Sequence, residues 1–364
     1  MENLIPLEYY SFVYYNALLA TVLLVYFNTT INDFGSKKNG DFLPLLGWLF
    51  AAFVIVHIGL RPIDPAFVDM TMYAHMFNLF ADGTNDVTAI EGDRGFNMFL
   101  LVTSKIMTVK TFFLVCALLY IVPLIIASFR WFKNLWFYGF LMLVISFSFL
   151  GYGVNGIRNG IATSLFILAL SFWDRKVIMA ALLVLSISFH KSMSLPIFAL
   201  VATLFHNNVR TYLKGWIAAI PISLIVGNLF VTLFTTLGFD DARVNIYFNE
   251  TAIDDPVSGF RWDFILYSAT GVFAGWYFIV KKNFSDPLYA RIVNIYLIAN
   301  AFWILIIKAG FSNRFAYLSW FLLAVVITYP MIKVRILKDQ HNVLGKIIVV
   351  YFMFTYLLNY ILHA

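Results

Sequence analysis

The chain has 364 residues, of which 62% are hydrophobic and 12% are charged, and its formal net charge is +6. Soluble domains carry about 25% charged residues, so this composition excludes a soluble globular protein. It also excludes an intrinsically disordered chain, which has few apolar residues and much charge. We therefore expect an all-α, polytopic membrane helix bundle, because each membrane-spanning helix needs about 20 mainly apolar residues.

Twelve apolar segments bounded by Lys, Arg, Asp, Gly or Pro are predicted to be transmembrane helices. In chain order they are 9–28, 42–60, 111–129, 134–150, 157–173, 176–190, 192–206, 215–235, 262–280, 289–308, 313–332 and 344–362. The segment 96–109 is too short to cross alone, so it predicts an interfacial or re-entrant helix. No room is left for a large soluble domain, and residues 1–364 are expected to form a single integral membrane domain.

The distribution of basic residues predicts the orientation of the chain. The loops on one side of the predicted spans carry 15 of the 25 Lys and Arg residues but only five of the 19 acidic residues. The positive-inside rule assigns this side to the cytoplasm. Both termini and two long loops, 61–95 and 236–261, are then expected outside, where a functional site would be built.

Polar residues of the first outer loop are the first candidates for a site. Asp69 and Tyr73 are four residues apart in PAFVDMTMYAHMFNLF, a pattern that predicts an amphipathic helix along the membrane surface. Asp93 follows two residues after Glu91. These carboxylates could bond sugar hydroxyls or a base, and the alternative is a solvated acidic loop.

The segment GYGVNGIRNG, residues 151–160, is the second candidate. Asn155, Arg158 and Asn159 have the spacing i, i+3, i+4 and are expected on one helix face. Arg158 begins a strongly apolar helix, and the N–H groups of an outer helix N-terminus together with a guanidinium suit a phosphate. The alternative is a glycine-rich turn with an interfacial arginine.

Two adjacent residues, His190 and Lys191, lie at the outer junction of two predicted spans. A histidine can act as a general base or acid near neutral pH. The positive charge of Lys191 is expected to favour the neutral imidazole, which a base requires. The alternative is a histidine bonded to a carbonyl group at a helix end.

Arginine recurs at two further outer helix starts. Arg261 and Asp263 stand just before an apolar span, and Arg314 opens an aromatic helix at another outer junction. Because arginine forms bidentate pairs with phosphate oxygens, Arg158, Arg261 and Arg314 could together surround a pyrophosphate.

Motifs of common cofactor and metal sites are missing from the sequence, including the P-loop, CxxC and HExxH. The acidic pairs Asp240–Asp241 and Asp254–Asp255 are weak indications of a divalent metal site. No metal or other cofactor is therefore expected. The positive charge follows loop position, so no nucleic-acid partner is expected either.

The candidate motifs form an ordered set. They are Asp-x-x-x-Tyr at 69–73, Asp-Arg-Gly-Phe at 93–96, an arginine opening a small-residue helix at 158, Phe-His-Lys-Ser at 189–192, Gly-Phe-Arg-x-Asp-Phe at 259–264 and Asn-Arg at 313–314. This set, within about residues 45–330, resembles the EpsG family, which belongs with the Wzy-type polymerases of bacterial surface polysaccharides. The usual Glu-Pro-Gly-Phe of the family stands here as Asp93-Arg94-Gly95-Phe96.

The resemblance implies a GT-C-like glycosyltransferase of the bacterial inner (plasma) membrane. Such an enzyme moves a growing glycan from undecaprenyl diphosphate to a lipid-linked oligosaccharide repeat unit at the periplasmic or outer face. It uses no nucleotide sugar and serves O-antigen, capsule or exopolysaccharide biosynthesis. The expected partners are the undecaprenyl-diphosphate-linked oligosaccharide and the lipid bilayer, and a chain-length regulator protein is a candidate third partner.

Roles for the candidate residues follow from this reaction. Arg158, Arg261 and Arg314 are expected to hold the diphosphate. His190 is expected to deprotonate the acceptor hydroxyl, with Asp263 or Asp69 as the next candidate base. The expected substrate contacts are Tyr73, Asp93, Asn155, Asn159 and Lys191.

Three other classes of membrane protein fit parts of the pattern. A flippase for lipid-linked oligosaccharides would also need an arginine-lined cavity, but with charges deep in the spans and on both sides. A membrane O-acyltransferase would use a histidine reachable from the cytoplasm. A glycosyltransferase that uses polyprenyl-phosphate sugars would place an acidic catalytic residue in the first outer loop.

Overall fold

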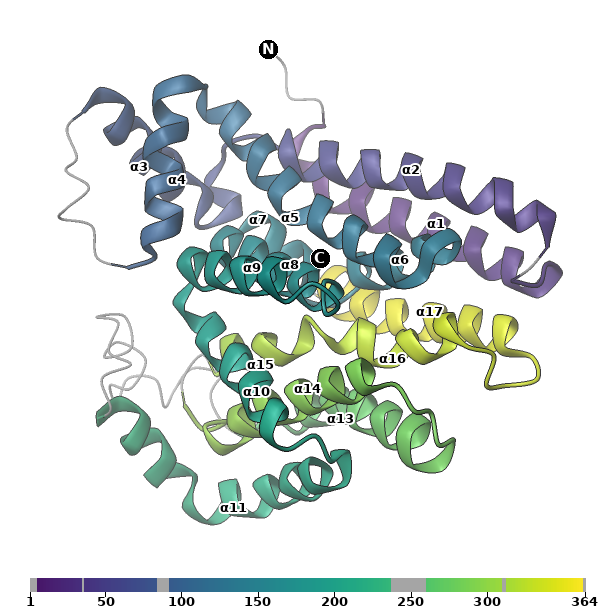
Figure 1. The fold of residues 1–364 in the computed structure, drawn as a ribbon. Coiled ribbons are helices and arrows are strands. Elements are labelled where there is room, and N and C mark those ends of the chain that lie inside the picture. Colours follow the sequence, from purple (N-terminus) through teal and green to yellow (C-terminus); the bar gives the residue numbers. More distant parts are fainter. Residues whose placement is uncertain (1–4, 35, 84–91, 237–259, 310–311, 363–364) are drawn as a thin grey trace. The chain divides into compact units, whose positions relative to one another are not determined.

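The computed structural model describes residues 5–34, 36–83, 92–236, 260–309 and 312–362. Within these ranges the chain is helical and contains no β-strand, which confirms the all-α prediction. The chain splits into two compact units (Figure 1), one formed by Met1–Met193 with Met331–Ala364 and the other by Ser194–Pro330. The single membrane domain stays a prediction.

The first unit contains two pairs of long helices and a group of shorter ones. Its helices are α1 (Tyr10–Ile31), α2 (Lys37–Gly59), α3 (Met70–Asp82), α4 (Arg94–Ile106), α5 (Val109–Phe132), α6 (Trp136–Val144), α7 (Phe149–Val154), α8 (Ile157–Ser171), α9 (Lys176–Phe189) and α17 (Gln340–Tyr356). Helix α1 packs along α17, α5 packs against α2, and α8 contacts both α5 and α9.

Helix α8 is the buried centre of the first unit. Every residue from Gly160 to Ser171 is buried, as expected for a helix that is apolar all round. Hydroxyl groups join it to its neighbours: Ser164 donates to the Tyr120 carbonyl at 2.5 Å, and Ser186 of α9 donates to the Ala162 carbonyl at 2.6 Å. Small residues and such interhelical hydrogen bonds are typical of helix packing in membranes.

The second unit contains α10 (Ser194–Phe205), α11 (Val209–Thr236), α13 (Trp262–Gly275), α14 (Pro287–Leu305), α15 (Asn313–Trp320) and most of α16 (Leu323–Lys333). The buried amide of Asn300 holds four of them together. It accepts a hydrogen bond from Trp216 at 2.7 Å and donates to Ser268 and Ser319 at 3.0 and 2.9 Å. Because a buried polar group is costly without partners, this network fixes how α11, α13, α14 and α15 meet.

Fewer segments are long enough to cross a membrane than the sequence predicts. Each of the twelve predicted segments contains a helix, but in the described part of the chain eight are long and apolar enough to span. The predicted segment 134–150 is interrupted, since α6 ends at Val144 and α7 begins at Phe149. Helices α8, α9 and α10 have 15, 14 and 12 residues. At 1.5 Å per residue they are about 18–23 Å long, short of the roughly 30 Å hydrocarbon core.

Two short helices stand where the sequence predicts them. Helix α4 has 13 residues and covers positions 96–106 of the segment that is too short to cross, and an extended residue, Met107, follows it before α5. Helix α3 follows Asp69 and buries Met70, Tyr73 and Phe77 on one face, which confirms an amphipathic helix in the first long loop.

Candidate functional site

The start of α4 places Asp93 deep in the first unit. Gly95, in the first turn, packs so closely on α9 that an added Cβ would lie 2.8 Å from the backbone carbonyl carbon of Ser188. The side chain of Asp93 is 7% exposed and does not cap its own helix. Its carboxylate is therefore available to partners from other helices.

Asp93 joins two segments that are far apart in the sequence. Its Oδ2 accepts a hydrogen bond from the Arg158 guanidinium at 2.8 Å, and its Oδ1 accepts one from the backbone N–H of Lys191 at 2.9 Å. Arg158 is the second residue of α8, where the sequence predicts an arginine at a helix start. The pair is partly buried, because the Arg158 side chain is 22% exposed.

Tyr73 of α3 forms a second contact with Arg158. Its hydroxyl accepts a hydrogen bond from Arg158 Nε at 3.1 Å, and its ring packs edge-on against Phe96 at 5.5 Å between centroids. Burial raises the pKa of Tyr73, and the nearby charge of Arg158 opposes this rise. Tyr73 is thus a neutral phenol at physiological pH that orients the guanidinium.

His190, at the C-terminal end of α9, lies beside the same carboxylate. Its Nε2 is 4.0 Å from Asp93 Oδ2. Its Nδ1 accepts a hydrogen bond from the backbone N–H of Ser192 at 3.2 Å and lies 2.7 Å from the Ser192 hydroxyl. A backbone N–H can only donate, so Nδ1 is an acceptor and Nε2 carries the proton of the neutral ring.

Ser192 connects His190 to the start of α8. Its hydroxyl donates to Asn159 Oδ1 at 3.0 Å and lies within reach of His190 Nδ1. Ser192, His190 and Asp93 thus line up as hydroxyl, imidazole and carboxylate. In such an arrangement the imidazole takes a proton from the hydroxyl, and the carboxylate stabilises the imidazolium that forms. Ser192 was not singled out from the sequence, although it ends the Phe-His-Lys-Ser motif.

Arg61 is a second residue that the sequence reasoning missed. It is 6% exposed, and its guanidinium donates to the carbonyls of Ile58 at 2.5 Å and Val154 at 3.1 Å. The guanidinium also lies 5.2 Å from the centre of the Phe113 ring. A buried cation held by one carbonyl near the end of α2 and one at the end of α7 positions the junction that precedes Arg158. The sequence feature that could have identified Arg61 is its position directly after a long apolar span.

Other predicted residues of the first unit differ from expectation. Asn155 does not share a helix face with Arg158, because Gly156 breaks the helix and α8 begins only at Ile157. Lys191 contributes its backbone N–H, while its side chain is exposed. Asp69 directly precedes α3, and its carboxylate interacts electrostatically with Tyr73 and Arg158.

The second unit gathers the remaining predicted residues. Arg261 pairs with both oxygens of Asp263, at 2.9 and 2.5 Å, and lies over the Phe264 ring. Tyr317 interacts electrostatically with Arg261 and with Arg314, which is exposed on the first turn of α15. These two arginines therefore share a neighbourhood. The acidic pairs at 240–241 and 254–255, and Glu91, lie outside the described residues.

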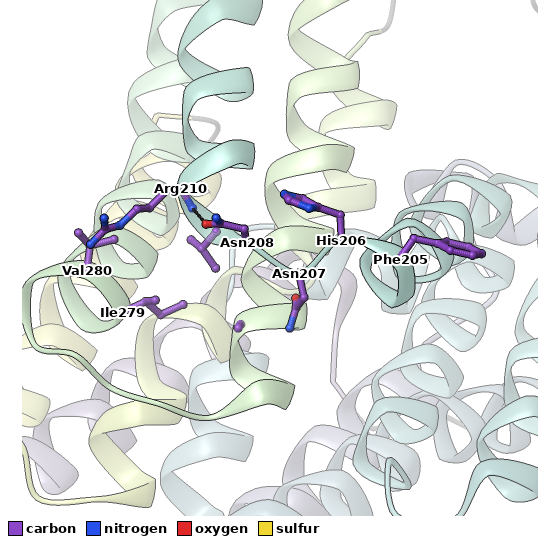
Figure 2. A pocket seen from close by; sticks show the side chains of 9 residues that line it. Phe205, His206, Asn207, Asn208, Arg210, Ile279 and Val280 are labelled. Carbon is purple, nitrogen blue, oxygen red and sulfur yellow. Dashed lines mark hydrogen bonds between the residues drawn. The ribbon is translucent and has the colours of Figure 1, made fainter.

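A cavity of about 490 Å³ in the second unit does not coincide with this arginine cluster. Figure 2 shows its lining, which includes His206, Asn207 and Arg210 from the turn between α10 and α11 and Val280 beyond the end of α13. Arg261 stands at the opposite end of α13. About 19 helical residues separate them, or nearly 30 Å along the axis.

The close approach of α4 and α9 predicts the effect of a methyl group. Gly95→Ala is expected to lower stability by about 1–3 kcal/mol, because the added Cβ collides with the backbone of Ser188. Thermal unfolding of the purified protein measures this effect. The control is Gly151→Ala in α7, where an added Cβ meets nothing within 4 Å. Equal melting temperatures for the two variants would contradict the packing described here.

Comparison with known proteins supplies the family. A family model described as the EpsG family matches residues 45–364. Comparisons with curated proteins and with solved structures found no match. The matched range includes every predicted site residue, from Asp69 to Arg314. The chain is therefore a member of the EpsG family.

Proposed function

We propose that this protein is a polysaccharide polymerase of the Wzy type. Membership of the EpsG family suggests a membrane protein of polysaccharide biosynthesis that resembles polymerases. The observation that carries the proposal further is the cluster of Arg158, Asp93 and His190, which combines an anion-binding cation with a proton acceptor. The transfer of a glycan from a lipid diphosphate requires both of these functions.

In the proposed reaction, a glycan leaves undecaprenyl diphosphate for a sugar hydroxyl. The bond between the anomeric carbon and the diphosphate oxygen breaks, and a bond from that carbon to the acceptor oxygen forms. The acceptor proton goes to the enzyme, and undecaprenyl diphosphate leaves as the anion. In this proposal Arg158 stabilises the negative charge that develops on the diphosphate. Arg261 and Arg314 stay the other predicted diphosphate ligands.

The proton path uses the neutral tautomer of His190. Nδ1 lies 2.7 Å from the Ser192 hydroxyl, whose own proton points to Asn159 Oδ1. In the proposed relay this proton turns to Nδ1 as the Ser192 oxygen takes up the proton of the acceptor. The imidazolium that forms carries its other proton on Nε2, which lies toward Asp93. Asp93 then stabilises the imidazolium as the carboxylate of a catalytic triad does. Asp69 and Asp263 remain the next candidate bases.

One carboxylate oxygen links substrate binding to this proton path. Asp93 Oδ2 is bonded to Arg158 and is also the oxygen closest to His190 Nε2. A diphosphate that binds Arg158 in place shares its guanidinium charge with Asp93 and leaves Oδ2 a stronger acceptor for His190. The histidine then becomes a stronger base only when the donor lipid is bound.

The location proposed for the reaction is the outer face of the bacterial inner membrane, with both termini outside. The excess of Lys and Arg in the opposite loops supports this orientation. The twelve-span, GT-C-like topology belongs to the same proposal. In this topology α8, α9 and α10 each cross the bilayer although they are short, and α6 and α7 cross it as one interrupted span.

Purified protein tests the proposal directly. When it is mixed in detergent with lipid-linked repeat units, we expect a ladder of glycans and released undecaprenyl diphosphate, without a nucleotide sugar. Gel electrophoresis with mass spectrometry of the lipid measures both products. A requirement for an acyl donor, a nucleotide sugar or a polyprenyl-phosphate sugar would contradict the proposal. So would translocation without a ladder in proteoliposomes, which is the result for a flippase.

A further inference from the structure

A cavity of about 500 Å³ lies in the first unit where the ends of several helices meet. Asp33 and Phe34 line it just after α1, Leu135 lines it between α5 and α6, and Gln340 lines it at the start of α17. Helices α1, α5 and α17 belong to segments long and apolar enough to span a membrane. A cavity at the ends of membrane-spanning helices is expected at the level of the lipid headgroups.

The cavity is lined by an excess of positive charge. Lys333 at the end of α16 and Arg335 and Lys338 in the loop that follows contribute three cations, against one carboxylate, Asp33. Arg335 and Lys338 are exposed, and Lys333 donates a hydrogen bond to the Trp131 carbonyl at 3.1 Å. The loop lies on the side that the positive-inside rule assigns to the cytoplasm. It is therefore distinct from the proposed outer site.

The loop that carries these cations is held in one conformation. The side chain of Gln340, which is 3% exposed, accepts hydrogen bonds from the backbone N–H groups of Ile336 and Leu337 at 2.6 and 3.0 Å. It also donates to the Val334 carbonyl at 2.8 Å. Arg335 donates to the Lys338 carbonyl at 2.9 Å. A pre-organised cationic loop loses little conformational entropy when it binds an anion.

The remaining lining is aromatic and apolar. His341 is buried, bonded through Nε2 to the Tyr138 hydroxyl at 2.7 Å, and its ring lies 4.4 Å from that of Phe34. Val334 is 51% exposed between Lys333 and Arg335. An occupant therefore meets cations beside apolar surface, which matches the boundary between the phosphate and the acyl chains of a lipid.

We propose that this cavity binds the phosphate of an anionic phospholipid headgroup. Basic pockets between membrane helices on the cytoplasmic side recognise such headgroups, and each Lys or Arg near an anionic membrane surface contributes about 1 kcal/mol. The lipid is favoured over a soluble phosphate because the cavity lies at the ends of membrane helices and includes exposed apolar surface. A bound lipid contacts the α1–α2, α5–α6 and α16–α17 connections together.

Lipid titration of the full-length protein in neutral detergent tests this proposal. Phosphatidylglycerol is added, and thermal unfolding gives the apparent affinity from the rise in melting temperature. The double variant Arg335→Gln/Lys338→Gln is expected to bind roughly tenfold more weakly or worse. The double variant Arg335→Lys/Lys338→Arg, which keeps both charges, is expected to bind as the wild type does. Both side chains are exposed, so neither variant should affect folding.

A matched control separates this cavity from basic surface in general. Arg175→Gln/Lys176→Gln removes two adjacent exposed charges at the α8–α9 turn, on the same predicted side. It is expected to leave the affinity unchanged. Equal weakening by both double variants, or no weakening by the cavity variant, would overturn the proposal. So would an equal stabilisation by phosphatidylcholine or by inorganic phosphate, since the first carries no net charge and the second no lipid. None of these outcomes depends on polymerase activity.

Discussion

Replacement of Arg158 by alanine is expected to lower the rate of polymer formation by about two to three orders of magnitude. The guanidinium is held by Asp93 at 2.8 Å and by the Tyr73 hydroxyl at 3.1 Å, so it is aimed before the substrate arrives. Such pre-organised charge is most effective where negative charge develops in the transition state. Arg158→Lys is expected to recover only part of the rate, because an ammonium cannot form the same bidentate contact with phosphate. Initial rates of glycan ladder formation measure both effects.

A double variant distinguishes a catalytic role for the Arg158–Asp93 pair from a structural one. Loss of the arginine alone leaves Asp93 as a buried charge without its ion-pair partner, which destabilises the protein. In Arg158→Met/Asp93→Asn neither charge of this pair remains, so the melting temperature is expected to recover while activity does not. Arg175→Ala, which removes an exposed arginine, serves as the control with normal activity. Recovery of activity together with stability would show that the Arg158–Asp93 pair only supports the fold.

The parts of the fold that the sequence predicts are those set by local patterns. Apolar runs place the helices, and the spacing of Met70, Tyr73 and Phe77 gives the amphipathic face of α3. The number of membrane-spanning helices is not set by local patterns alone. Average hydropathy does not register the break between α6 and α7, because residues on both sides of it are apolar. The prediction of twelve spans therefore exceeds the eight segments long enough to cross.

The candidate site shows the same division. The positions of Arg158 at a helix start and of His190 at a helix end could be predicted from the local sequence. The helix break at Gly156, which places Asn155 outside α8, could not. The contacts that define their chemistry join residues 65 and 98 positions apart, from Asp93 to Arg158 and from Asp93 to Lys191. No periodicity carries that information. The resemblance to a family supplied it only as a list of motifs, without showing that Asp93 is their common partner.

Asp93→Asn is expected to reduce the rate of polymer formation by about two to four orders of magnitude. The amide oxygen of asparagine can still accept the hydrogen bond from the Lys191 N–H, so the local backbone is retained. The negative charge that faces both Arg158 and His190 is lost. Because a nearby carboxylate favours the protonated imidazole, the acidic limb of the pH–rate profile is expected to move to lower pH. Ladder assays between about pH 5 and 8 measure the rate and the shift together.

The position of this shift tests the assignment of roles more sharply than the loss of rate. A carboxylate that only supports the fold would change the amount of active protein and leave the pH–rate profile in place. Asp82→Asn, at an exposed residue near the end of α3, is the control with an unchanged rate and profile. If Asp69→Asn or Asp263→Asn caused the large loss while Asp93→Asn stayed active, the base would be one of those two residues. The chain Asp93–His190–Ser192 would then not be the proton path, because its first member would be dispensable.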